Sequence, residues 1–378
     1  WLKPQRLMSF TVGVFHSTKF AQLTRAQLRR GRRGGRPRHG GCSAALGLFG
    51  SRLMGSLIAT SAGFVPCPTG RLVAAGAGSE GLSQPQICDA ILSLSGKEKP
   101  SVLYIGTATY DLPGPRQKQT SLFVERGCAV ASLAVADVTP TAEEVQRAFD
   151  SAEVVIVSGG NTLFAIDRWV RLGINDHLRK ALERGVVLGG GSAGAICWFD
   201  AGHSDSMDPT SYKRPMLRGG VVGADESSDA PASEAEKKSW EYIRVPCLGF
   251  LPGLVCPHHD KTQSNGVLRA EDFDRMLLRH TGETGIGIDH WAALVVEGEN
   301  YRVVSLEGKE GSVLEDGRFS AERLGKPGIW RKRVQDGAVQ AEVVPSSGKV
   351  ADLLRSPTEI VHDARVELVR RANPDDVP

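Results

Sequence analysis

Short apolar runs alternate with amphipathic stretches along this chain from residue 71 onward. Runs of β-branched and aliphatic residues predict strands at residues 72–75, 102–105, 129–135, 154–157, 186–188, 254–256 and 292–296. Apolar positions at helical spacing predict helices at residues 84–94, 116–126, 141–150, 162–172, 175–184 and 271–280. Because the strands are apolar almost throughout, they are typical of strands buried on both faces. The pattern predicts an α/β fold of three layers, with a mostly parallel sheet between helices.

The ends of the chain and one internal stretch depart from this pattern. After residue 303 it becomes typical of β-hairpins, with D-G turn signals at residues 316–317 and 336–337. Residues 217–238 are acidic and rich in Ser and Ala, which is typical of a surface loop. The first seventy residues are of low complexity. We therefore expect a basic extension over residues 1–70, an α/β domain over 71–310, and a hairpin-like extension with a tail over 311–378.

Charge is divided unevenly between these parts. The chain has 46 Lys and Arg and 43 Asp and Glu, but no acidic residue precedes Glu80. The α/β domain is therefore acidic overall, so we expect it to bind no nucleic acid. The basic leader fits a transit peptide, a flexible tail or an over-extended start upstream of Met54. We expect a cytoplasmic protein, or a mitochondrial or plastid one if the leader is a transit peptide.

Cysteine spacing and hydropathy exclude several classes. The seven cysteines include no C-x-x-C pair, which excludes a zinc ribbon and a thioredoxin-like motif. We expect reduced thiols. No run of about 18 apolar residues is present, so neither a transmembrane helix nor a membrane partner is predicted. The expected assembly is a monomer or a homodimer.

One segment combines a buried strand, a tight glycine turn and the start of a helix. It contains G-G-S-A-G at residues 190–194, a form of the G-x-S-x-G nucleophile elbow. A sharp turn at the carboxyl end of a strand carries the Ser192 hydroxyl into the crevice where α/β folds bind ligands. Ser192 is therefore a candidate nucleophile, although small residues also join strands to helices for structural reasons alone.

Three further motifs surround the elbow. S-G-G-N-T at residues 158–162 precedes it, and A-G-H-S-D-S-M-D-P at 201–209 and L-V-C-P-H-H-D at 254–260 follow. In this order the four motifs resemble the peptidase E family of S51 aspartyl dipeptidases and cyanophycinases. The resemblance covers residues 72–305. It implies a flavodoxin-like core similar to class I glutamine amidotransferases, in agreement with the periodicity.

The resemblance also implies roles for single residues. Ser192 matches the nucleophile of the family, and His258 matches its general base. Gly160 and Ala193 match the pair whose N–H groups form the oxyanion hole. Gly191 stands where many members carry a larger residue, so we expect it to widen the crevice.

Three charged residues complete the predicted site. Asp205, in the loop after the elbow, is our choice for the acid that orients His258, and Asp289 is the alternative. Arg269 falls where the family has an arginine that pairs with the substrate aspartate, and an arginine fork suits a carboxylate. Arg269 also fits a solvated charge at a helix start.

Two other kinds of site receive less support. His258, His259 and Asp260 could form a metal cluster, but no further ligands follow at metal spacing. Residues 76–81 read G-x-G-x-x-G, yet no acidic residue ends a second strand about twenty positions later, as a dinucleotide site requires. We therefore expect neither a metal nor a cofactor.

The sequence predicts a serine exopeptidase that hydrolyses short peptides with an N-terminal aspartate through a Ser-His-Asp acyl-enzyme mechanism. One alternative is a cyanophycinase-like or isoaspartyl peptide hydrolase that uses the same residues. Another is a catalytically silent α/β binding module. The presence of both Ser192 and His258 favours an enzyme.

Overall fold

The computed structural model describes residues 67–213, 216 and 239–372. These residues lie in one compact unit, Ala59–Pro378. The acidic stretch at residues 217–238 and nearly all of the expected N-terminal extension lie outside the described residues.

Eight strands form the first sheet, in the order β14-β11-β10-β1-β5-β4-β2-β3. Its parallel strands are β1 (Arg71–Ala75), β2 (Val102–Ile105), β3 (Val130–Ser132), β4 (Val154–Val157) and β5 (Val187–Gly191). The antiparallel strands beyond β1 are β10 (Ala292–Glu297), β11 (Asn300–Ser305) and β14 (Ser347–Lys349). Every residue of β2, β4 and β5 is buried, as their apolar sequences predict.

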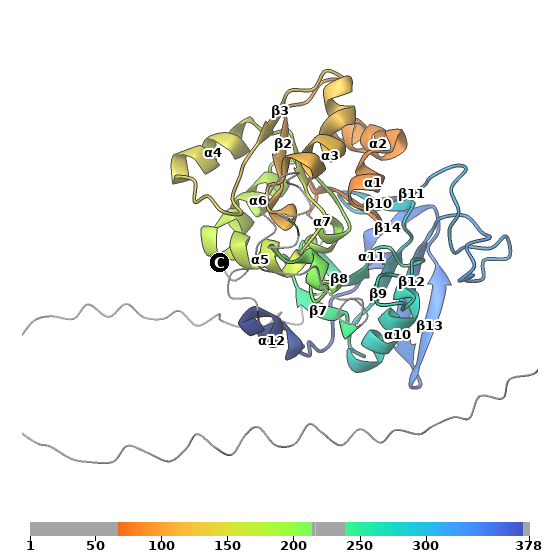
Figure 1. Cartoon of the computed structure of the whole chain (residues 1–378). Coiled ribbons are helices and arrows are strands. Elements are labelled where there is room, and N and C mark those ends of the chain that lie inside the picture. The colour runs from red at the N-terminus through yellow and green to blue at the C-terminus, as the bar shows by residue number, and fades with distance from the viewer. Residues whose placement is uncertain (1–66, 214–215, 217–238, 373–378) are drawn as a thin grey trace, which may run out of the picture. The chain divides into compact units, whose positions relative to one another are not determined.

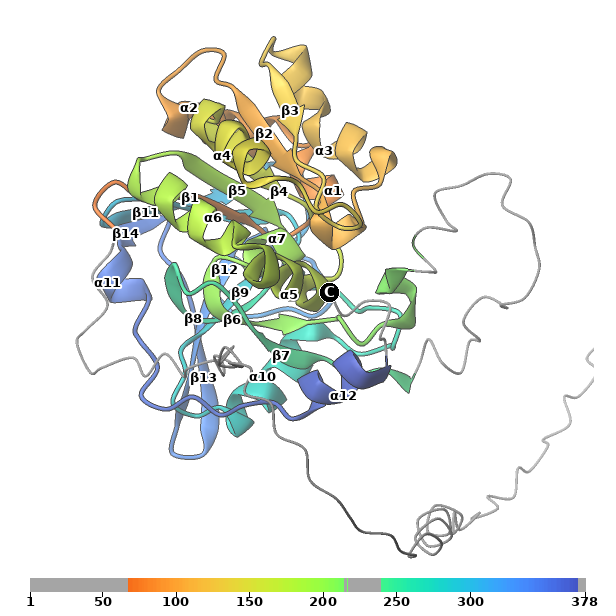
Figure 2. The same cartoon turned by 90° about the vertical axis from the view of Figure 1, so that its left-hand side faces the viewer.

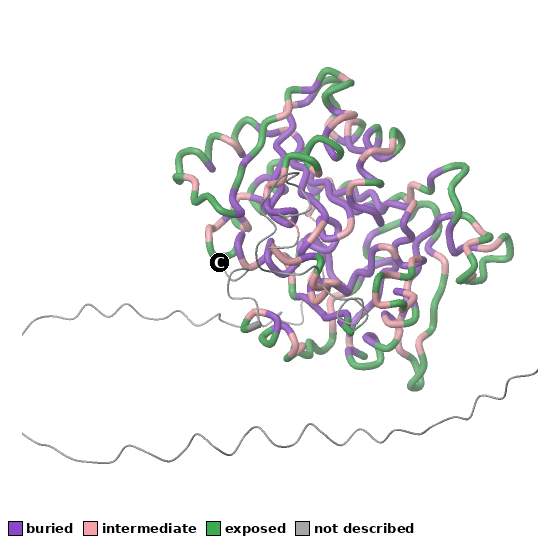
Figure 3. The backbone as a smooth tube through the Cα atoms, viewed as in Figure 1, coloured by how far each residue is buried: buried purple, intermediate pink, exposed green. Residues whose placement is uncertain are grey.

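Helices cover both faces of this sheet, as predicted. One face carries α2 (Pro85–Ser95) and α3 (Pro113–Glu125), and the other carries α4 (Ala142–Ser151), α5 (Thr162–Leu172) and α6 (Ile174–Glu183). Successive residues of β2 alternate between two cores, Leu103 with Trp169 of α5 and Tyr104 with Phe123 of α3. Figure 3 shows the buried residues gathered in the interior and the exposed residues along the outer loops and the outward sides of the helices. Among the described helices, none is long and apolar enough to cross a membrane.

A second sheet, in the order β13-β12-β9-β8-β6-β7, corrects the prediction of a single sheet. Its strands are β6 (Phe199–Ser204), β7 (Ile243–Pro246), β8 (Leu251–Cys256), β9 (Gly285–Ile288), β12 (Ile329–Gln335) and β13 (Ala338–Val343). The sequence of β6 is too polar to be recognised as a strand, yet all of it except Asp200 is buried. β6 pairs with β8, so the chain leaves the first sheet soon after the elbow. In Figures 1 and 2 the second sheet lies below the first, with α10 (Arg269–Arg279) beside it.

Residues beyond 310 contribute strands to both sheets. β12 pairs with β9, and β14 pairs with β11. The β12–β13 hairpin turns at Asp336 and Gly337, which both have positive φ, as the D-G signal predicts. The short α11 (Val350–Leu353) and α12 (Arg365–Ala372) follow.

Candidate active site

Ser192 occupies the junction between β5 and the short helix α7 (Ala193–Ile196), where its backbone has φ 56° and ψ −120°. A positive φ is rare for a residue with a side chain. Glycines keep the space around it open, because a Cβ on Gly159 would lie 3.3 Å from the Ser192 Cβ and one on Gly78 3.5 Å. The side chain of Ser192 is partly exposed. The local geometry is therefore that of an elbow, as the motif predicts.

Gly191 has a packing role. A Cβ at this position would lie 2.0 Å from the carbonyl oxygen of Ala77, in the turn after β1. The place of a larger side chain is thus already filled by backbone. Gly191 brings two turns into contact and does not widen a crevice, contrary to our expectation.

Two backbone N–H groups close to the elbow are available to a ligand: that of Ala193, and that of Gly160, which follows the Gly159 that packs against Ser192. Ala193 is the first residue of α7, so its N–H has no acceptor within the helix. Gly160 has φ 117°, and a Cβ there would lie 2.1 Å from the Ala108 carbonyl oxygen, so only glycine fits. Neither N–H donates to an acceptor among the described residues. This arrangement is suited to binding an oxyanion.

His258 lies in the turn after β8 and also has a positive φ, of 49°. Its N–H donates to the carbonyl of Gly76, 3.1 Å away. Gly76 and Gly78 belong to the same turn after β1, and Gly78 flanks Ser192. One turn therefore contacts both residues, although no described hydrogen bond joins the Ser192 hydroxyl to His258.

The partner of the His258 ring is a histidine. His258 Nδ1 lies 2.8 Å from Nδ1 of His290, in the turn between β9 and β10. His290 Nε2 lies 2.9 Å from Oε2 of Glu80, in the short helix α1 (Ser79–Leu82). Burial and the charges of Arg269, His290 and Lys261 hold the pKa of His258 well below its usual value. Burial also lowers the pKa of His290, against the opposing effect of Glu80.

Asp205 and Arg269 contact each other. Arg269 Nη1 lies 3.3 Å from Asp205 Oδ2, and Nη2 donates to the carbonyl of His203 at 2.6 Å. The guanidinium also stacks over the Tyr242 ring, and its side chain is 0% exposed. In this geometry Asp205 does not contact His258, and Arg269 is not open to a substrate carboxylate. The solvated role for Arg269 is excluded by its burial.

Asp289 organises the backbone around it. Its carboxylate accepts hydrogen bonds from the N–H and hydroxyl of Ser312 and from the N–H of Gly328. It also lies 3.4 Å from His259 Nδ1. Burial raises the pKa of Asp289 to about 6. Asp289 therefore anchors the segment before β12 and does not reach His258.

His258, His259 and Asp260 do not converge on one point, although His258 and Asp260 both contact His290, through its ring and its N–H respectively. His258 faces His290, whereas His259 packs against the rings of Phe319 and Trp330. Within the described ranges no group of three His, Cys, Asp or Glu side chains is arranged to hold a metal ion.

His290 and Glu80 were not predicted from the sequence. Each had a signal, since His290 lies two residues after the end of β9 and Glu80 lies in the glycine-rich stretch after β1. Their contact joins two turns that are far apart in the sequence.

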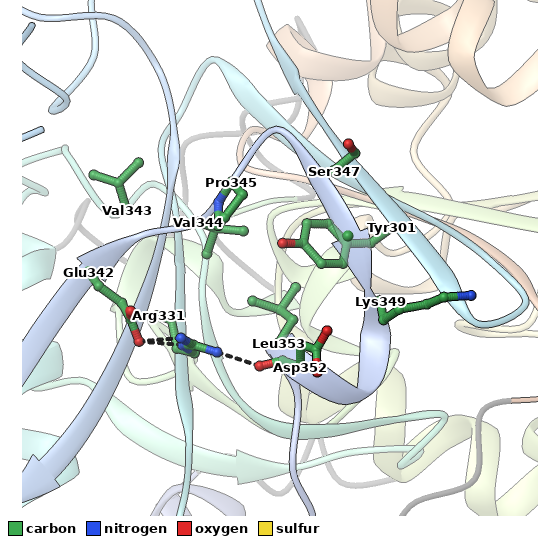
Figure 4. Close-up of a pocket in the computed structure, with 11 residues that line it drawn as sticks. Tyr301, Arg331, Glu342, Val343, Val344, Pro345, Ser347, Lys349, Asp352 and Leu353 are labelled. Atoms are coloured by element: carbon green, nitrogen blue, oxygen red, sulfur yellow. Dashed lines mark hydrogen bonds and ion pairs between the residues drawn. The ribbon is translucent and has the colours of Figure 1, made fainter.

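A pocket of about 220 Å³ lies elsewhere, between β11 to β14 and α11. Arg331 reaches across it to Glu342 and to the carbonyl of Asp352 (Figure 4). No predicted site residue lines this pocket, so it is separate from the candidate active site.

Comparisons with known proteins point to a peptidase family. The model of Peptidase family S51 matches residues 72–304. The uncharacterized peptidase YgaJ from Bacillus subtilis (strain 168) is 30% identical over 171 residues, which are 45% of this chain and 59% of that protein. Among solved structures, a peptidase from an acI-B1 Actinobacterium has a TM-score of 0.47 at 16% identity, covering 74% of this chain and 96% of that chain.

Another relative carries an unrelated name. A Trypanosoma brucei brucei protein called G2/mitotic-specific cyclin-1 is 31% identical over 319 residues, 78% of this chain and 91% of that protein. A cyclin is not a peptidase, and no function of this chain follows from that name.

Proposed function

The chain belongs to peptidase family S51 and is a peptidase, and on that premise we propose that it is a serine peptidase with Ser192 as nucleophile and His258 as general base. The observation that carries the proposal is the strained backbone of Ser192 beside two unpartnered N–H groups. Such strain persists only where the surrounding structure enforces it, and it concentrates at functional sites.

The proposed reaction begins when the Ser192 hydroxyl attacks the scissile carbonyl and His258 takes its proton through Nε2. The carbonyl oxygen becomes negative and accepts hydrogen bonds from the N–H groups of Gly160 and Ala193. His258 then gives the proton to the departing amine, which leaves an acyl-enzyme. Water, deprotonated by the same histidine, releases the acid and restores Ser192.

The proposed substrates are short peptides with an N-terminal aspartate. Support comes from the charges near the base, because Arg269 and Lys261 both act on His258 as positive neighbours. Positive charge beside a reacting centre favours a substrate that brings a carboxylate. Arg269 is already paired with Asp205 and offers neither a preformed fork nor a net charge, so the positive field at the base comes mainly from Lys261.

Two measurements test the proposal. A fluorophosphonate probe should attach to Ser192 in the wild-type protein and leave Ser192→Ala unlabelled. A dipeptide panel that varies the first residue, and includes β-linked aspartyl peptides, should show fastest cleavage of Asp-Xaa. No labelling and no cleavage would favour a binding module, whereas faster cleavage of the β-linked peptides would favour the isoaspartyl alternative.

A further inference from the structure

Three side chains form a row that starts at the proposed base. His258 Nδ1 contacts His290 Nδ1 at 2.8 Å, and His290 Nε2 contacts Glu80 at 2.9 Å. His290 is 7% exposed in its side chain, whereas Glu80 is 56% exposed. The row therefore runs from the partly exposed base through a buried ring to a carboxylate at the surface.

The chemistry of these groups determines where their protons lie. An ionised carboxylate only accepts hydrogen bonds, so Glu80 accepts from His290 Nε2–H. Nδ1 of the neutral His290 ring then carries a lone pair and accepts from His258 Nδ1–H. Nε2 of His258 is left without a proton, which is the state that a base for Ser192 requires.

We propose that His290 and Glu80 are a positioning relay that holds His258 in this tautomer. The inference rests on the proposed function, because it assumes that His258 is the base. The relay performs the orienting role that the sequence analysis gave to Asp205. When His258 takes the proton of Ser192, the resulting imidazolium is stabilised by His290 directly and by the Glu80 charge one ring further away.

Backbone contacts hold both rings in place. The N–H of His258 donates to the Gly76 carbonyl, and the N–H of His290 donates to Asp260 Oδ1 at 2.7 Å. A Cβ on Gly76 would lie 1.9 Å from the carbonyl oxygen of Asp289, so only glycine permits this approach. The glycine-rich turn after β1 therefore brings the members of the relay together.

Protonation of the relay should switch the base off. If the His290 ring gains a proton, its Nδ1–H donates to His258 Nδ1 and forces the His258 proton onto Nε2. The base then has no lone pair for Ser192. The charged groups that face the two rings are Glu80, Asp260, Lys261 and Arg269. Only the Glu80 contact depends on an exposed side chain, so it can be removed with little effect on folding.

Two variants at position 290 separate the relay from simple packing. His290→Asp places a carboxylate oxygen near the former Nδ1, so it offers His258 Nδ1–H a direct acceptor. His290→Leu offers none. We expect kcat to fall about 10²–10⁴-fold in His290→Leu, the usual contribution of a positioned base. The loss in His290→Asp should be at least about tenfold smaller, with KM little changed in both variants.

A double-mutant cycle with Glu80→Ala tests the second link. We expect Glu80→Ala to lower kcat about tenfold in the wild-type background, where His290 needs the carboxylate. The same change should have no effect beside His290→Asp, because the direct acceptor no longer uses Glu80. Glu98→Ala, another exposed glutamate, is the matched control and should behave as wild type.

Two readouts report the tautomer itself. Imidazole ¹⁵N spectra should show His258 protonated at Nδ1 in the wild type and as a mixture of tautomers in Glu80→Ala. In the pH profile of kcat/KM, the acid limb of Glu80→Ala should move to lower pH, since the carboxylate favours protonation of His290.

The outcomes distinguish this inference from the function on which it rests. The relay would be overturned if Glu80→Ala kept the kcat, the acid limb and the His258 tautomer of the wild-type protein. Labelling of Ser192 by the fluorophosphonate would in that case still support the peptidase. Failure of the wild-type protein to label or to hydrolyse any peptide would instead overturn the proposed function.

Discussion

The two sides of His258 use their charges differently. On one side, Arg269 is completely buried and bound to Asp205, so both charges serve the structure around them. On the other side, Glu80 is half-exposed and reaches His258 only through His290. A buried charge must keep its partners, whereas an exposed carboxylate at the end of a hydrogen-bonded row can act on the base at little structural cost. An aspartate in the loop after the elbow therefore need not be the acid that serves the base, and in our proposal the exposed Glu80 takes that role.

The largest effect is expected at Ser192, the proposed nucleophile that His258 activates. Ser192→Ala should lower kcat about 10⁶-fold, because the members of a serine catalytic set act as a unit. The unfolding midpoint should change little, since Ala keeps the same backbone at the elbow. Turnover of the best dipeptide and circular dichroism measure the two effects. A variant with near wild-type turnover would remove Ser192 from the mechanism.

The next effect is on the free energy of unfolding, and it distinguishes Arg269 on one side of His258 from Glu80 on the other. Arg269→Leu should destabilise the protein by about 1.5–3 kcal/mol, because it removes the buried guanidinium with its hydrogen bonds and leaves Asp205, which is 25% exposed, without its partner. Glu80→Ala should leave the free energy of unfolding nearly unchanged, since its carboxylate is solvated. Urea unfolding compares them. Equal urea midpoints for the two variants would mean that the Arg269–Asp205 pair stabilises the fold no more than a surface contact does.

Asp205→Asn sharpens the comparison at the level of catalysis. The amide still accepts a hydrogen bond from Arg269 and does not alter the contacts of His258, so kcat should fall less than about tenfold. If Asp205 were the orienting acid, as the sequence analysis expected, the loss would be about 10⁴-fold. A steady-state measurement of kcat decides between the two values.

The smallest effect is a shift of the pH profile. Burial and positive neighbours disfavour the imidazolium forms of His258 and His290, so both pKa values lie below the usual histidine range. Because the base works in its neutral form, activity should persist as pH falls through about 6.5, the usual histidine value, and decline only below it. A pH series of kcat/KM measures the limb. An acid limb above pH 7 would contradict the electrostatics of this site.

Local sequence patterns predicted the first sheet well but not the second. The predicted strands at residues 102–105 and 154–157 coincide with β2 and β4, because continuous apolar runs have few structural alternatives. β6 was missed because its polar residues are satisfied by distant partners, such as His203 by Asp272 of α10. The active site divides in the same way, since the elbow is local and the partner of His258 is not.

The sequence by itself determined the parallel α/β core, the elbow at Ser192 and the likeness to an S51 peptidase. These depend on residues that are neighbours in the chain, where hydrophobic spacing and glycine turns act directly. Only the tertiary structure decided that Arg269 binds Asp205 and that His258 meets His290 and Glu80. Those contacts join loops and helix starts that follow strands of both sheets, and the register and packing of whole elements set such distances.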